Sequence, residues 1–168
     1  MHAKKGFTLI EILVVMAVLT ILTTITIGGA RMVQQTARAR RFGVTKEVLR
    51  TAIARYRAEY NRWPGEDAGS GGEKKKYKDD NYLVIDDLRE GGKGNPDRIR
   101  FLDETSILTS VDGKVVPLSS ASSSGCPAVY VTKDGTKTAY YEVTIDFELD
   151  TVTVGPDNMV SGTPDDEY

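Results

Sequence analysis

The sequence predicts an α+β fold in which a long N-terminal α-helix packs on a small antiparallel β-sheet, followed by a C-terminal loop. Three observations lead to this prediction. Residues 7–27 are mostly apolar with a single charge, residues 31–62 continue with an apolar stripe at helical spacing, and residues 128–154 alternate apolar and polar side chains. The stripe needs a partner surface, and a sheet with one apolar face supplies it.

The apolar run Phe7–Ile27 contains a single charged residue, Glu11, and follows the short basic leader 1–6. About 20 apolar residues in a helix cross the hydrocarbon core of a membrane. The run is too long for a secretory signal peptide and lacks its small-residue cleavage site. We therefore expect residues 7–30 to form a membrane-embedded helix, with Lys4 and Lys5 on the cytoplasmic side and the remainder outside.

Glu11 is the residue that a plain membrane anchor leaves unexplained. A carboxylate within the bilayer costs about 2.5–3.5 kcal/mol on insertion scales. We therefore expect Glu11 to have a partner of opposite charge.

Residues 31–62 are predicted to be helical because apolar side chains recur on one face: Leu49, Ile53, Tyr56 and Tyr60. Pro64 ends the helix, and the preceding Trp63 is expected in the core. The arginines at the start of this segment suit anionic lipid or acidic neighbours. Few aromatic residues interleave them, which argues against nucleic-acid binding.

Residues 63–127 are expected as loops, with a short helix or extended segment near 81–89 and a low-complexity linker at 117–127. The single Cys126 excludes an internal disulfide and is expected to be a small buried residue. Strands are predicted at 128–132, 138–147 and 151–154, joined by turns at Asp134–Gly135 and 148–150. The acidic loop completes the segment 128–168.

The C-terminal loop carries Asp157 and the pair Asp165–Asp166. Calcium takes six to eight oxygen ligands from carboxylates and loop carbonyls. A loop that folds back can bring these side chains around one ion. The alternative is that the acidic tail is simply solvated.

The string Lys-Gly-Phe-Thr-Leu-Ile-Glu-Ile-Leu-Val-Val, residues 5–15, resembles the class III signal of type IV pilins and type II secretion pseudopilins. The resemblance implies that a prepilin peptidase cuts between Gly6 and Phe7 and methylates the new N-terminus at Phe7. It also implies that Glu11 pairs with the N-terminal amine of a neighbouring subunit. Opposite charges in low dielectric attract strongly, which agrees with this role.

The phrase Tyr56 to Pro64 and the acidic loop resemble the major pseudopilin of type II secretion, whose C-terminal loop binds calcium. By that resemblance Asp157, Asp165 and Asp166 supply carboxylates, and carbonyls come from Val154, Val160 and Gly162. The sequence departs from the family at Asn158, where glycine is usual, and at the apolar Met159–Val160.

The resemblance implies a structural subunit of a pseudopilus that drives protein export, with a type IV pilus pilin, major or minor, as the alternative. The chain is then a leader (1–6), an assembly helix (7–30) and a periplasmic pilin-like domain (31–168), held in the inner membrane until assembly. Expected partners are further copies, the peptidase, the inner-membrane platform, minor pseudopilins and membrane lipid. An anchored enzyme is disfavoured, because the only histidine lies in the leader and a small sheet leaves little room for a substrate cleft.

Overall fold

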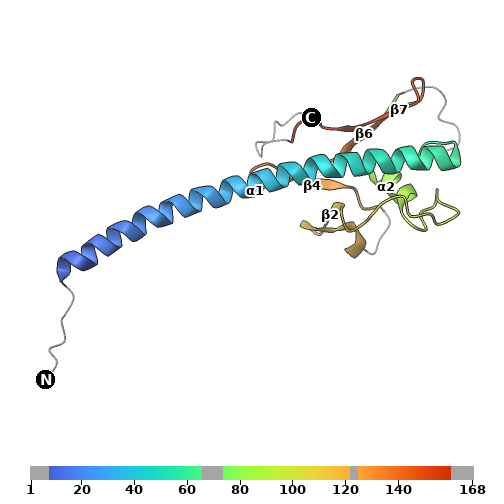
Figure 1. Cartoon of the computed structure of the whole chain (residues 1–168). Coiled ribbons are helices and arrows are strands. Elements are labelled where there is room, and N and C mark those ends of the chain that lie inside the picture. Colours follow the sequence, from blue (N-terminus) through green and yellow to red (C-terminus); the bar gives the residue numbers. More distant parts are fainter. Residues whose placement is uncertain (1–7, 66–73, 122–124, 160–168) are drawn as a thin grey trace. The chain divides into compact units, whose positions relative to one another are not determined.

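One long helix, α1 (Leu9–Tyr60), begins in the apolar run and ends close to the predicted boundary (Figure 1). The computed structural model describes residues 8–65, 74–121 and 125–159, without the side chains of 24–28. The chain divides into two units, residues 1–37 and residues 38–168. The helix expected at 31–62 is confirmed, and it ends two residues early.

The end of α1 is set by the residues that directly follow it. Asn61 has a positive φ of 52°, the left-handed conformation that commonly follows a helix, and its N–H donates to the Arg57 carbonyl at 2.9 Å. Pro64 then disfavours further helix. Trp63 is buried, as predicted.

The strands form two antiparallel sheets rather than the single sheet that was predicted. The three-stranded sheet has the order β1-β6-β7, and the four-stranded sheet has the order β3-β2-β4-β5. The bounds in the first sheet are β1 (Lys75–Tyr77), β6 (Glu142–Asp146) and β7 (Thr151–Gly155). Those in the second are β2 (Leu108–Val111), β3 (Lys114–Pro117), β4 (Val129–Val131) and β5 (Thr138–Tyr140).

A single core joins α1 to both sheets. Leu49, Ile53 and Tyr56 have no exposed surface, and they belong to the same buried cluster as Val143 and Ile145 of β6. In Figure 1, β6 and β7 lie along one side of this part of α1, and a short helix, α2 (Tyr82–Leu88), lies along the other with β2 and β4. The predicted α+β class and the role of the apolar stripe are confirmed.

The expected long strand at 138–147 is interrupted at Tyr141, which places β5 and β6 in different sheets. The buried Asn81 side chain donates to the Tyr141 carbonyl at 2.7 Å and to the Ala128 carbonyl at 3.0 Å, and it accepts the Ala128 N–H at 2.8 Å. The Tyr141 N–H also donates to Ala128. These bonds take residue 141 out of a continuous ladder, so the prediction of one strand was wrong.

The short helix or extended segment expected near 81–89 is a helix, α2 (Tyr82–Leu88). The prediction of loops over the rest of 63–127 was wrong, because this segment also holds β1, β2 and β3. The β2–β3 hairpin turns at Asp112–Gly113, both with positive φ, as a two-residue hairpin loop requires. The supposed linker contains a 3-10 turn (Leu118–Ser120), and its Leu118 and Cys126 are buried. The expected burial of Cys126 is confirmed.

We predict that Ile53→Ala lowers the free energy of unfolding by about 2–4 kcal/mol, because it leaves a cavity where α1 meets both sheets. Val44→Ala is the matched control on the same helix, since Val44 is 63% exposed and its truncation should change stability by less than about 0.5 kcal/mol. Chemical denaturation of the two variants measures the difference. Equal stability would contradict the assigned core.

Candidate functional site

The first turn of α1 is closed by a reciprocal pair of contacts between Thr8 and Glu11. The Thr8 N–H and hydroxyl donate to Glu11 Oε2 at 2.7 and 2.9 Å, and the Glu11 N–H approaches Thr8 Oγ1 at 3.4 Å. This is a capping box, in which a threonine before the helix and a glutamate three residues later satisfy each other's backbone donors. Glu11 is therefore both the lone acidic residue of the apolar run and part of the helix start.

The prediction from sequence missed the role of Thr8. The signal was present, because Thr-x-x-Glu directly before an apolar run is the pattern of a capping box. The contacts engage Oε2, and no hydrogen bond from a described residue reaches Oε1. The cap thus holds the carboxylate in place while one of its oxygens stays available to another donor.

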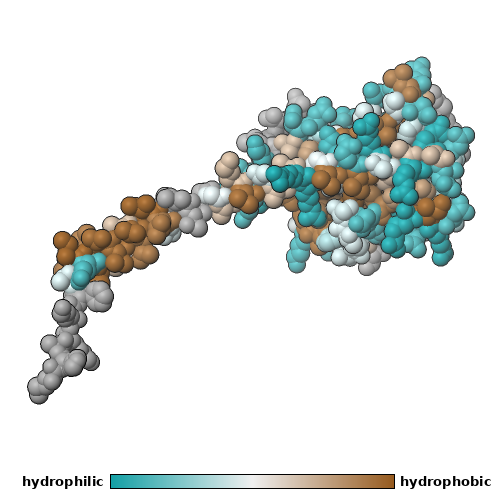
Figure 2. All heavy atoms as spheres, in the orientation of Figure 1, coloured by the Kyte–Doolittle hydropathy of each residue, from teal (hydrophilic) through white to brown (hydrophobic). Residues whose placement is uncertain are grey.

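Beyond the cap, α1 presents apolar side chains on every side. Leu9, Ile10, Ile12 and Leu13, in the first turns of the helix, are between 46% and 84% exposed, and the large apolar residues from Val14 to Leu22 are at least half exposed. Figure 2 shows this part of the helix as a brown surface, whereas the domain beyond residue 38 is mostly teal. A helix that is hydrophobic all round is normally covered by protein or lipid.

The polar groups within this surface are satisfied by the helix itself. The hydroxyls of Thr20 and Thr23 donate to the carbonyls of Met16 and Leu19 at 2.8 and 2.7 Å. Threonine side chains commonly bond to the carbonyl four residues earlier. Between Leu9 and Thr23, Glu11 is therefore the only ionisable side chain on this surface.

Two of the predicted site residues, Gly6 and Phe7, lie outside the described residues. The expected membrane segment 7–30 also includes Phe7 and the undescribed side chains of 24–28. Over the described residues, no helix combines the length and the apolar character that crossing a membrane requires.

The start of the C-terminal loop lies against α1. Lys46 Nζ donates to the Pro156 carbonyl at 2.9 Å and lies 3.9 Å from Asp157 Oδ1. The Lys46 side chain is 18% exposed, whereas that of Asp157 is fully exposed. An ion pair with one exposed partner contributes little, so the carbonyl bond is the firmer contact.

Only part of the predicted calcium site is described. Asp165, Asp166, Val160 and Gly162 lie outside the described residues, and Val154 lies in β7. Within the described ranges, no three or more His, Cys, Asp or Glu side chains gather at a metal-binding spacing. The Pro156 and Asp157 oxygens are donors of the type calcium takes, but both already face the Lys46 ammonium.

Comparison with known proteins gives one match. Residues 1–27 match the family model described as the prokaryotic N-terminal methylation motif. No curated protein and no solved structure matches the chain.

The motif supports a protein of the type IV pilin-like class. A prepilin-type signal implies processing by a prepilin peptidase, anchoring in a membrane and assembly into a filament, and proteins with this motif are structural subunits. A long N-terminal helix followed by antiparallel sheets is consistent with a pilin-like fold. The match ends at residue 27, so it describes the helix start and not the domain that follows.

We predict that Thr8→Ala frays the first turn of α1, because loss of an N-cap costs about 1 kcal/mol. The amides of Ile12 and Leu13, measured by hydrogen exchange in detergent micelles, should exchange about fivefold faster. Thr8→Ser keeps the hydroxyl and should exchange like the unaltered chain. Equal protection in all three proteins would show that the cap contributes nothing.

Proposed function

We propose that the protein is a structural subunit of a pseudopilus, which assembles through its N-terminal helix to drive protein export through a type II secretion system. The observation that carries the proposal is a capped helix, exposed and apolar on all sides, that begins within a methylation motif and holds one carboxylate. Neighbouring helices of the same kind cover such a surface, and a neighbour's amine gives the carboxylate a partner.

The proposed sequence of events starts in the inner membrane, where residues 7–30 reside and residues 31–168 face the periplasm. The peptidase cuts after Gly6 and methylates Phe7, which creates a cationic amine at the start of the helix. On assembly this amine pairs with Glu11 of an adjacent copy. Pairing favours one register, because a shifted helix leaves both charges buried without a partner.

The choice of a pseudopilin over a type IV pilin rests on the phrase Tyr60–Pro64, the acidic C-terminal loop and the single cysteine. Many type IV pilins close a C-terminal loop with a pair of cysteines, which this chain lacks. Loss of the protein should therefore abolish export of a secreted enzyme while leaving surface pili. Loss of pili with normal export would favour the type IV pilin instead.

We predict that mass spectrometry of the mature chain finds a methylated Phe7 at the N-terminus, and that Glu11→Gln is processed but fails to assemble. Glutamine keeps the side-chain size and an oxygen for Thr8, but it replaces the charge and the second acceptor oxygen with a neutral amide group. Removing one partner of a buried ion pair costs about 3–5 kcal/mol, which should reduce filament yield by at least about a hundredfold.

The control for Glu11→Gln is Thr8→Ser, which should be processed and assembled normally. Filament yield is measured by shearing and electron microscopy after the chain is overproduced with the assembly machinery. An unprocessed chain that begins at Met1 would contradict the proposal. Normal filaments from Glu11→Gln would reject the role of the charge.

We also propose that the C-terminal loop binds calcium through the carboxylates of Asp157, Asp165 and Asp166. Calcium should raise the thermal midpoint by mass action, because it binds the folded loop. Lys46→Met should increase this effect, since it removes an ammonium that faces the same oxygens. Identical melting curves in calcium and in EDTA, for both proteins, would reject the site.

A further inference from the structure

Two large apolar side chains stand out on the domain that starts at residue 38. Leu149 is 71% exposed and Val44 is 63% exposed, more than any other large apolar side chain described there. They lie on different elements, Leu149 in the β6–β7 turn and Val44 on α1. One is on a projecting turn and the other borders a groove.

The β6–β7 turn holds Leu149 outward between two acidic residues, and we call Glu148, Leu149 and Asp150 the knob. The turn lies at the edge of the domain in Figure 1. The Leu149 N–H donates to Asp146 Oδ1 at 3.0 Å, and Asp150 pairs with Arg57 Nε of α1 at 3.0 Å. The knob is therefore held in a defined position without its leucine being buried.

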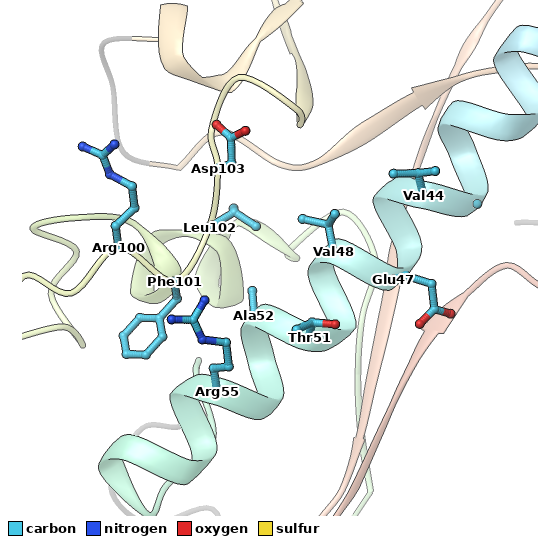
Figure 3. Close-up of a pocket in the computed structure, with 11 residues that line it drawn as sticks. Val44, Glu47, Val48, Thr51, Ala52, Arg55, Arg100, Phe101, Leu102 and Asp103 are labelled. Carbon is cyan, nitrogen blue, oxygen red and sulfur yellow. The ribbon is translucent and has the colours of Figure 1, made fainter.

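The groove runs between α1 and the segment 100–103 and has a volume of about 650 Å³. Figure 3 shows Val48 and Ala52 pointing toward Phe101 and Leu102, which form the opposite wall. Val44 extends the same helix face. The floor of the groove is thus apolar, and its size suits a leucine side chain with its neighbours.

The charges at the rim are not equivalent. In Figure 3 Glu47 points away from Leu102, whereas Arg55 lies beside Phe101. The Asp103 carboxylate is engaged by the Thr105 N–H and hydroxyl at 3.1 and 2.7 Å, and these bonds lower the pKa of Asp103. Arg100 pairs with Glu90 at 2.9 Å.

Arg55 and Glu47 are the rim charges that make no hydrogen bond or ion pair with a described residue. Arg55 is the one that lies beside Phe101, and Glu148 is its counterpart on the knob. Both side chains are exposed, and neither makes a hydrogen bond or ion pair with a described residue. The groove thus carries an available cation beside an apolar floor. The knob carries an available anion beside an exposed leucine.

We propose that the knob of one copy of this chain seats in the groove of a second copy, with Leu149 against Val44 and Val48 and with Glu148 beside Arg55. Knob and groove are different surfaces, so each contact leaves one of each available for a further copy. A head-to-tail contact that does not close gives an open filament. The inference rests on the proposed function and specifies which surfaces of the domain meet in the filament.

Cysteine cross-linking in cells that produce the full chain and its assembly machinery tests this contact. The chain with both Leu149→Cys and Val44→Cys should give a ladder of covalent multimers on oxidation, because a disulfide needs Cβ atoms within about 4.5 Å. Two differently tagged chains, one with each change, should give mixed dimers and no ladder. The native Cys126 is buried, and the single variants control for it.

The matched control replaces Val44→Cys by Val115→Cys, which lies on β3 and is also exposed. This pair should give much less cross-linked product, because the proposed contact does not bring residue 115 within disulfide distance of residue 149. The inference would be overturned if the Leu149→Cys and Val44→Cys chain gave no more cross-linked product than this control. It would also be overturned if the cysteine at position 149 were cross-linked to a different protein and not to a second copy of this chain.

A charge exchange gives a second measurement that does not depend on cysteines. Glu148→Arg should reduce filament yield by about threefold to tenfold, and Arg55→Glu in the same chain should restore it. Absence of rescue would contradict the contact. Methylation of Phe7 in the same material tests the proposed function separately, so a methylated chain in filaments without the cross-link rejects only the inference.

Discussion

The constraint on which the structure depends is that one helix carries two different apolar surfaces, and each must be covered. From Leu49 to Tyr56 the apolar side chains lie on one face of α1 and are buried by the domain's own sheets. From Leu9 to Leu22 they lie on every face and are exposed. The first surface folds the domain, and the second requires lipid or other helices. Lipid would cover this second surface in a membrane, and neighbouring helices would cover it in a filament.

Glu11 lies on the exposed surface and bears on both the single chain and the proposed assembly. Its carboxylate caps its own helix through Thr8, which gives a single chain a satisfied helix start. In an assembly of identical processed chains, every copy has a new N-terminal amine at Phe7, four residues before its own Glu11. In the proposed assembly one residue therefore serves both local helix geometry and register between copies, because the cap engages only one of its two oxygens.

The sequence allowed the helix, the stripe and the regions of β4 to β7 to be predicted, with β5 and β6 as one strand, because their signals are local periodicities of 3.6 and 2. It did not show that the strand at 138–147 breaks, because the cause is Asn81, 60 residues earlier in the chain. The β2–β3 hairpin was missed although Asp112–Gly113 is a strong turn signal. In β1 only Tyr77 is fully buried, so a lysine run resembled a solvated loop. The capping box could have been recognised from Thr8 and Glu11 but was overlooked. Of the carboxylates predicted to bind calcium, only Asp157 falls within the described residues.

The most direct measurement of the central claim is the distance between the Phe7 nitrogen and the Glu11 side-chain carboxyl carbon of adjacent copies. Solid-state NMR on filaments in which half the copies carry ¹⁵N at Phe7 and half carry ¹³C at Glu11 reports only contacts between copies. The account predicts a separation of about 4 Å or less, as in a paired ammonium and carboxylate. Absence of any such contact in intact filaments would contradict it.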